Sequence, residues 1–150
     1  MLTLTRKYQF SACHRLNSPW LDEEANRKLY GKCNHPQGHG HNYGVEITVT
    51  GPVESDTGMI CRLAVLDEAV GRAVGENCDH QDLNRTLGVN FITTGENLAQ
   101  WIFSALNPLL PFPVRLVRVK LQETRKNSFV LFDATVPDSP LDVKSSFFFL

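Results

Sequence analysis

Apolar and polar residues alternate along residues 2–14 with the period of a half-buried β-strand. One face of this strand is mainly apolar and ends in a histidine: Leu2, Leu4, Tyr8, Phe10, Ala12 and His14. The alternation returns from His41 to Thr50 and again places a histidine on the apolar face. Two further strands are predicted at residues 114–124 and 129–132, joined by a turn.

Between these two pairs of strands, the apolar residues recur with the period of a helix. The first helix is predicted from a set of residues at helical spacing: Leu63, Leu66, Val70 and Val74. The second follows a capping-box sequence, Thr93-x-x-Glu96, and stops before Pro108. A short helix is also predicted at residues 22–30. The strand-strand-helix-helix-strand-strand order predicts an α+β domain, with a four-stranded antiparallel sheet and both helices on one face.

Length and composition limit the class of protein. A chain of 150 residues is long enough for one domain with a proper core, so we expect residues 1–150 to form a single domain. The tail from about residue 135 has no assigned role, although its terminal Phe-Phe-Phe-Leu, residues 147–150, should pack on the domain or on a neighbour. The net charge of −1 argues against non-specific nucleic-acid binding.

Sequence features also indicate a cellular compartment. No apolar run reaches the length of a membrane span, and the N-terminus lacks the apolar stretch of a secretory signal. The four cysteines are widely and irregularly spaced, which is typical of free thiols in a reducing compartment. We therefore expect a cytoplasmic protein with no membrane partner.

The densest chemistry lies in residues 31–43, Gly-Lys-Cys-Asn-His-Pro-Gln-Gly-His-Gly-His-Asn-Tyr. His39 and His41 are one residue apart, so on an extended segment both point to the same face and suit a divalent metal such as zinc. If the first two strands pair antiparallel, His14 joins them, and three histidines with an open fourth position form the ligand set of a catalytic zinc. Cys33 is either a further ligand or a thiolate beside the metal. The alternative is a glycine-rich surface turn with incidental histidines.

Two carboxylates carry weaker signals. Asp79 precedes His80, and a carboxylate near an imidazole can hold its tautomer and raise its basicity, although both could also be solvated loop residues. Glu123 falls on the apolar face of the third predicted strand, where a ligand with several N–H donors would match it unless it turns out to water. Residues 1–32 carry an excess of basic groups, which suits a small anionic ligand.

These motifs resemble, in the same order, those of the 6-pyruvoyl-tetrahydropterin synthase family. The resemblance runs from about residue 5 to residue 133 and rests on the following segments: residues 10–16, residues 31–43, Thr57-Gly58-Met59, Asp79-His80, Thr94-Gly95-Glu96-Asn97 and Glu123-Thr124. It implies the T-fold, a homohexamer of two trimers with active sites at subunit interfaces, and one zinc ion per subunit. The implied reaction is the conversion of 7,8-dihydroneopterin triphosphate to 6-pyruvoyl-tetrahydropterin with elimination of triphosphate.

The resemblance also implies roles for individual residues. The three histidines would hold the zinc, Cys33 would be the general base, Asp79 and His80 would assist proton transfer, and Glu123 would anchor the pterin ring. Further candidates for substrate binding are four residues: Arg15, Lys32, Thr94 and Glu96. The chain departs from the family pattern at Arg62, in place of a small polar helix cap, and at Cys13, in place of a serine. Strand alternation turns Cys13 away from the metal.

Three alternatives remain open. The 6-carboxytetrahydropterin synthases of queuosine biosynthesis share the fold, but they more often have three residues between the cysteine and the His-x-His pair, whereas this chain has five. A non-catalytic pterin- or zinc-binding protein of this fold would not need Cys33, Asp79 and His80 together. A structural zinc module would need a closed fourth ligand, which Cys33 could supply.

Overall fold

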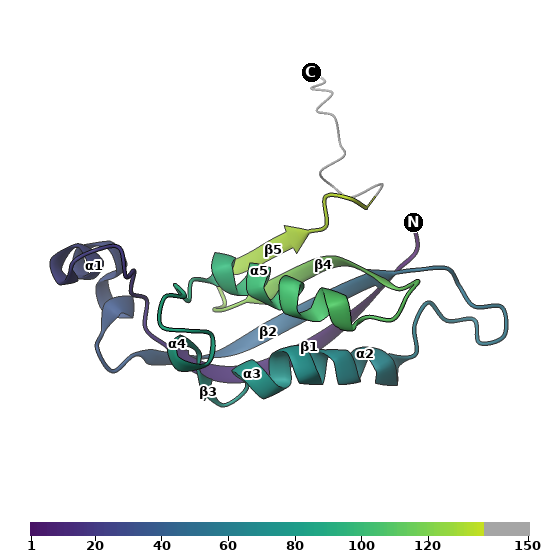
Figure 1. Ribbon diagram of the computed structural model, residues 1–150, viewed down its shortest axis with the longest axis horizontal. Helices are drawn as coiled ribbons and strands as arrows, with labels where there is room; N and C mark the ends of the chain where they lie inside the picture. Colours follow the sequence, from purple (N-terminus) through teal and green to yellow (C-terminus); the bar gives the residue numbers. More distant parts are fainter. Residues whose placement is uncertain (137–150) are drawn as a thin grey trace, which may run out of the picture.

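One mixed five-stranded sheet organises the protein, in the order β3-β1-β2-β4-β5 (Figure 1). The computed structural model describes residues 1–136, so the Phe-rich end at residues 147–150 lies outside it. The strands are β1 (Thr3–His14), β2 (His39–Thr50), β3 (Gln81–Asp82), β4 (Arg115–Gln122) and β5 (Ser128–Phe132). The four long strands pair antiparallel as predicted.

The prediction of a purely antiparallel, four-stranded sheet is corrected by β3. This strand pairs parallel with β1, opposite Ala12 and Cys13. Two residues are too few to show an alternating pattern, so nothing in the local sequence indicated a strand. Its position at the sheet edge places the preceding Asp79 and His80 beside the last part of β1.

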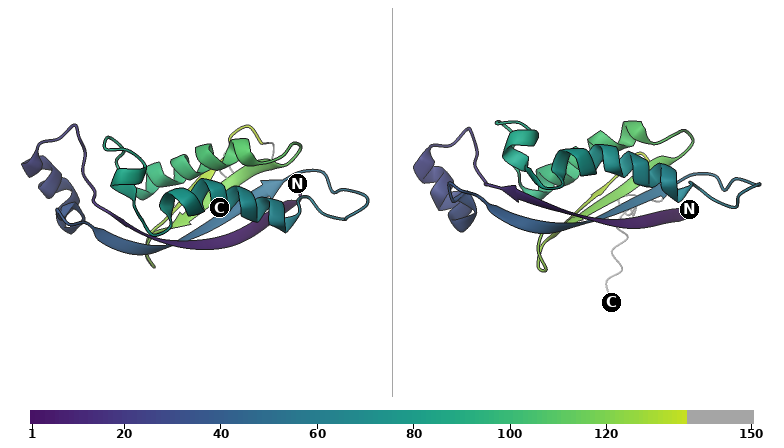
Figure 2. Two further views of the ribbon diagram at one scale, coloured as in Figure 1. Left: turned by 60° about the horizontal axis from the view of Figure 1, so that its bottom comes forward. Right: turned by 90° about the horizontal axis from the view of Figure 1, so that it is seen from below.

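The helices lie on one face of the sheet, as predicted (Figure 2). The first comprises α2 (Leu63–Val70), a π-helical segment η2 (Gly71–Gly75) and α3 (Glu76–Cys78), and α5 (Gly95–Leu106) lies beside η2 and covers β4 and β5. Leu63 was predicted to be on the buried face but is 44% exposed, because it is the first residue of the helix and burial starts only at Leu66. Within residues 1–136, no helix has the length and apolar character of a membrane span.

The helix α5 begins one residue later than the capping-box pattern predicted. Thr94 is the N-cap, and its hydroxyl accepts a hydrogen bond from the backbone N–H of Asn97 at 3.4 Å. Thr93 is fully buried and donates its hydroxyl to the carbonyl of Arg15 instead. A Cβ at Gly95 would overlap the ring of Phe129, so glycine permits the start of α5 to pack directly on β5.

The chain leaves the sheet between β1 and β2 and forms an excursion at one end of the molecule (Figure 1). The predicted short helix is α1 (Glu23–Tyr30), capped by Asp22, whose side chain accepts a hydrogen bond from the N–H of Ala25. The 3-10 turn η1 (Gly31–Asn34) follows and carries Cys33. The remaining short elements are α4 (Leu83–Thr86) and η3 (Asn107–Leu109).

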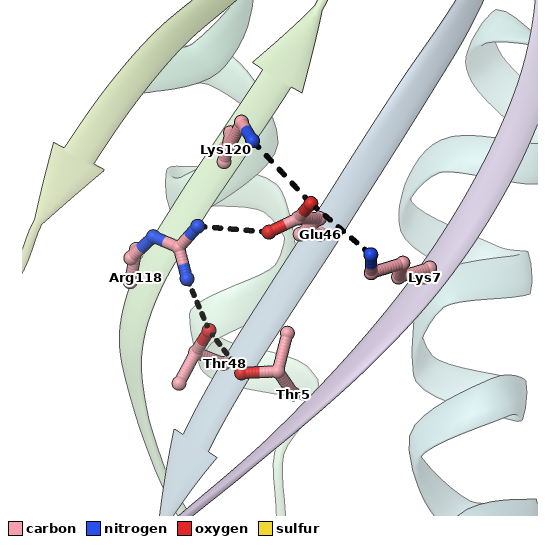
Figure 3. Close-up of polar contacts among 6 residues, drawn as sticks. All are labelled: Thr5, Lys7, Glu46, Thr48, Arg118 and Lys120. Carbon is pink, nitrogen blue, oxygen red and sulfur yellow. Dashed lines mark hydrogen bonds and ion pairs between the residues drawn. The ribbon is translucent and has the colours of Figure 1, made fainter.

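The two faces of the sheet differ in character. The inner face and the helices enclose the apolar core, which includes Tyr43, Val45, Ile47, Leu66, Leu98, Ile102 and Leu121. On the outer face, Glu46 accepts hydrogen bonds from Arg118 at 2.8 Å and Lys120 at 3.4 Å, and Lys7 lies 3.7 Å away (Figure 3). Charged side chains of β1, β2 and β4 thus form ion pairs on the face that the helices leave open, with three cations around one carboxylate.

Candidate metal centre and active site

The register of β1 and β2 gathers the three predicted metal ligands. His14 pairs with His39, and Ala12 pairs with His41, so all three imidazoles meet at the inner face where the strand pair ends. Their ligand nitrogen atoms all lie within 4.8 Å of one another. The expectation that antiparallel pairing would bring the three histidines together is confirmed.

A glycine allows the chain to enter β2 at the required position. Gly38 has φ of +69°, and its N–H donates to the carbonyl of His35 at 2.8 Å. A Cβ at Gly38 would lie 2.8 Å from the carbonyl oxygen of His14, too close for a side chain. The tight turn at residues 35–38 therefore brings His39 directly alongside His14.

The histidine group, defined as His14, His39 and His41, contains buried nitrogen atoms without hydrogen-bond partners. His14 is 2% exposed and donates its Nδ1–H to the carbonyl of Thr93 at 2.9 Å, which leaves Nε2 unprotonated. Within residues 1–136, neither this Nε2 nor Nδ1 of His39 has a hydrogen-bond partner. Buried polar atoms normally have partners, so two such atoms in one group indicate a place for a ligand.

The electrostatics of the group favour the form of histidine that binds metals. Burial, reinforced by the neighbouring His39, lowers the pKa of His14 to about 4. Burial also lowers the pKa of His39 and of His41, so all three imidazoles are neutral at neutral pH. Three neutral imidazoles with converging nitrogen atoms fit a zinc ion that keeps an open coordination position.

Glu123 lies at the edge of the histidine group. Its Oε1 is 3.8 Å from Nε2 of His14, and its side chain is 14% exposed. Burial raises the pKa of Glu123, and the negative charge of Glu96 adds to this effect, whereas His39 opposes it. Because His14 is neutral, the contact is not an ion pair, and the carboxyl remains available to a ligand.

Cys33 lies outside the histidine group, in η1, where its side chain is half-buried. Its carbonyl accepts a hydrogen bond from the N–H of Leu16 at 2.9 Å, two residues beyond His14.

Arg15 donates from its guanidinium to Asn34, next to Cys33 in the chain, whereas Lys32 is exposed on η1. Cys13 is exposed and faces away from the histidine group, as the alternation predicted.

Asp79 and His80 contact one another beside β1, at the β3 edge of the sheet. Oδ1 of Asp79 lies 3.0 Å from Nδ1 of His80 and accepts a hydrogen bond from the N–H of Ser11 at 2.9 Å. The bond from Ser11 lowers the pKa of Asp79, and His80 adds to this effect. His80 has φ of +56°, and its side chain is 83% exposed. Asp79 and His80 are not part of the histidine group within this chain.

Thr94 and Glu96 lie at the start of α5. Thr94 serves as the helix cap, and Glu96 is exposed in the first turn, where it acts on Glu123 through its charge. The structure thus places Glu96 near the predicted pterin anchor, although it forms no part of a capping box.

Sequence reasoning missed two residues at the site. Tyr43 was not named as a candidate, yet its hydroxyl is buried without a partner in residues 1–136, and its ring centroid lies 5.4 Å from that of His41. Its place on the same strand face as His41 was a usable signal. Thr93 contributes through its backbone carbonyl, and no side-chain pattern could have revealed that contact.

The sequence matches the 6-pyruvoyl tetrahydropterin synthase family over residues 3–133. The chain belongs to this family. It is 44% identical over 126 residues to the 6-pyruvoyl tetrahydrobiopterin synthase of Drosophila melanogaster, covering 83% of this chain and 75% of that protein. It is 42% identical over 129 residues to the human 6-pyruvoyl tetrahydrobiopterin synthase, covering 85% and 88%.

A solved structure supports the same assignment. The 6-pyruvoyl tetrahydropterin synthase of Caenorhabditis elegans superposes with a TM-score of 0.83 at 33% identity, covering 89% of this chain and 96% of that one. The predicted T-fold and the predicted membership of a lyase family are therefore confirmed.

Proposed function

We propose that this member of the family is a zinc-dependent lyase that converts 7,8-dihydroneopterin triphosphate to 6-pyruvoyl-tetrahydropterin and releases triphosphate. The observation that carries the proposal is the histidine group, whose buried nitrogen atoms on His14 and His39 lack partners within residues 1–136. Similarity to named synthases over most of the chain supports the same reaction. We further propose a single domain of residues 1–150 in a cytoplasmic homohexamer.

The histidine group would hold one zinc ion per subunit. When bound, zinc would acidify the side-chain hydroxyls of the substrate and stabilise negative charge on their oxygen atoms. The carbonyl of Thr93 keeps the proton of His14 on Nδ1, so Nε2 is directed to the metal in the correct tautomer. Neutral imidazoles require no deprotonation at neutral pH, which favours binding.

Glu123 would fix the orientation of the pterin ring. The guanidine-like edge of a pterin presents N–H donors in a row, and a carboxylate is the side chain that accepts two of them at once. Oε1 of Glu123 lies 3.8 Å from Nε2 of His14, so a pterin ring held by Glu123 would place the side chain of the substrate near the metal. The partial burial of Glu123 strengthens such hydrogen bonds by excluding water.

Cys33, Asp79 and His80 would move protons. A thiolate at Cys33 would remove a proton from a side-chain carbon of the substrate. Oδ1 of Asp79 lies 3.0 Å from Nδ1 of His80, so Asp79 would hold the proton on Nδ1 and leave Nε2 to exchange a proton with the substrate. Because Asp79 and His80 lie at the β3 edge, outside the histidine group, we propose that a second copy of the chain supplies this pair to the site. A hexamer of two trimers, with Arg15, Lys32, Thr94 and Glu96 near the substrate, is consistent with this arrangement.

Product analysis tests the reaction. The zinc-loaded protein is incubated with 7,8-dihydroneopterin triphosphate, and the pterin product is identified by mass. A pyruvoyl product with released triphosphate would support the proposal. A carboxy product with acetaldehyde would assign the chain to the 6-carboxytetrahydropterin synthase activity, and the absence of turnover would favour a non-catalytic pterin- or zinc-binding protein.

The variant Cys33→Ala tests the general base. We expect it to retain one zinc per chain and to lose turnover by about 10²- to 10⁴-fold, the usual contribution of a positioned base. Metal content and turnover are measured on the same sample. Loss of the metal in this variant would instead make Cys33 a ligand and favour the structural zinc site.

A further inference from the structure

We infer that Asn34 and Arg15 are positioning residues that fix the turn carrying Cys33 against the strand end carrying His14. This inference rests on the proposed function, in which Cys33 acts on a substrate held by the histidine group. The two residues themselves need not touch the substrate.

Hydrogen bonds join η1 directly to the segment that follows His14. Arg15 donates from Nε to the carbonyl of Asn34 at 2.8 Å and from Nη2 to its Oδ1 at 3.2 Å. Asn34 donates from Nδ2 to the carbonyl of Leu16 at 2.6 Å and to Oδ1 of Asn17 at 3.0 Å. The N–H of Leu16 donates to the carbonyl of Cys33 at 2.9 Å. These hydrogen bonds between η1 and residues 15–17, which we call the joint, hold the backbone on both sides of Cys33 in place.

Asn34 is the buried member of these part-buried contacts, so its hydrogen bonds are costly to lose. Asn34 is 1% exposed, and both its amide nitrogen and its amide oxygen are engaged. A buried hydrogen bond whose partner is removed leaves a desolvated polar group, so the joint cannot open without penalty. The guanidinium of Arg15 supplies two donors in a fixed plane, and a lysine cannot reproduce that geometry.

Further hydrogen bonds connect the joint to the histidine group. The N–H and carbonyl of Arg15 are bound by the side chain of Asn84 at 2.7 Å and 2.9 Å. The hydroxyl of Thr93 donates to the same carbonyl, and the carbonyl of Thr93 accepts from His14. One continuous set of contacts therefore runs from the histidine group through Arg15 and Asn34 to Cys33.

The chain offers a matched control at Asn26. This residue is also a buried asparagine of the excursion, 2% exposed, and it bonds the N–H and carbonyl of Ser18. It has no hydrogen bond to η1 within residues 1–136. A purely structural role of buried asparagines in the excursion predicts the same consequences for Asn26→Ala and Asn34→Ala.

Steady-state kinetics separate the two roles. We expect Asn34→Ala to lower kcat by about 10²-fold, the cost of a misplacement near 1 Å, while KM and zinc content stay unchanged. We expect Asn26→Ala to leave kcat unchanged. Arg15→Lys should also lower kcat, whereas a role of Arg15 in binding the triphosphate alone would raise KM and spare kcat. Equal kcat losses in Asn34→Ala and Asn26→Ala would overturn the inference.

Two readouts do not depend on turnover. Hydrogen exchange at the amide of Leu16 should be faster in Asn34→Ala than in the wild type and unchanged in Asn26→Ala. The rate of alkylation of Cys33 is followed by peptide mass spectrometry, with the exposed Cys13 as internal reference. This rate should differ from the wild-type rate in Asn34→Ala and equal it in Asn26→Ala. If the wild type shows no turnover, the proposed function fails while these readouts still test the joint. Unchanged exchange and alkylation in Asn34→Ala would overturn the inference itself.

Discussion

The strands β1 and β2 carry two groups of polar side chains, one on each face of the sheet, and the two groups are organised in opposite ways. On the outer face lies the Glu46 cluster, defined as Thr5, Lys7, Glu46, Thr48, Arg118 and Lys120 (Figure 3). In this cluster the carboxylate meets three cations, and Arg118 also donates to the hydroxyl of Thr48. On the inner face lies the histidine group, in which like side chains converge and two buried nitrogen atoms have no partner within residues 1–136.

The pKa shifts of the two groups show the same contrast. Burial raises the pKa of Glu46, but hydrogen bonds from Arg118 and Lys120 outweigh burial and lower it overall. For His14, burial and the neighbouring imidazoles act in the same direction and lower the pKa to about 4. A polar group that satisfies its own members stabilises the fold, whereas one that is buried and unsatisfied requires a ligand. This difference supports our proposal that the histidine group, and not the Glu46 cluster, is the functional one.

The largest expected effect follows from removing one member of the histidine group. We expect His39→Ala to lose both the zinc and the turnover, because two remaining imidazoles cannot form a three-ligand site. The free energy of unfolding of the metal-free protein should fall by no more than the packing of one half-buried ring, since the deleted Nδ1 has no hydrogen-bond partner to lose within residues 1–136. Metal analysis, a turnover assay and chemical denaturation without metal check the three parts. Retention of the zinc by His39→Ala would contradict the assignment of His39 as a metal ligand.

A smaller and opposite effect is expected in the Glu46 cluster. Glu46→Gln should keep zinc and turnover but lower the free energy of unfolding at neutral pH by up to about 1 kcal/mol, as for a partly exposed ion pair. The pKa of Glu46 is lower in the folded than in the unfolded chain, so its stabilisation is present above the unfolded pKa and disappears as the pH falls through the folded value.

Denaturation of the wild type and of Glu46→Gln, measured from neutral to acidic pH, therefore tests whether the charge of Glu46 stabilises the fold. The difference between the two proteins in the free energy of unfolding should shrink as the solution becomes more acidic. A difference that does not change with pH would show that the charge of Glu46 contributes nothing. A loss of zinc in Glu46→Gln would show that the two faces are coupled.

The long elements could be predicted from the sequence because each shows its period over many residues. The alternation along β1 and β2 placed His14 and His41 on one face, and antiparallel pairing then brought them together. The spacing of His39 and His41, together with His14 on the paired strand, was the basis of the predicted metal site, and the proximity of the three side chains follows from the strand register. In these places the local pattern and the tertiary structure depend on the same fact, the burial of one strand face.

Other features could not be predicted, because they depend on contacts between distant residues. The strand β3 is two residues long and exists only through its pairing with β1. Thr94 caps α5 instead of Thr93, because the carbonyl of Thr93 accepts a hydrogen bond from His14 and its hydroxyl donates one to the carbonyl of Arg15. Asn34 was not singled out from the sequence, because its role depends on hydrogen bonds to residues 15–17, which the local sequence does not show.

The proposed metal site uses three histidines as zinc ligands and leaves Cys33 outside the ligand set. X-ray absorption spectroscopy at the zinc edge of the metal-loaded wild type tests it most directly. A three-histidine site should show nitrogen or oxygen ligands at about 2.0–2.1 Å and no sulfur, and the spectrum of Cys33→Ala should be the same. A zinc–sulfur distance of about 2.3 Å that disappears in Cys33→Ala would contradict it.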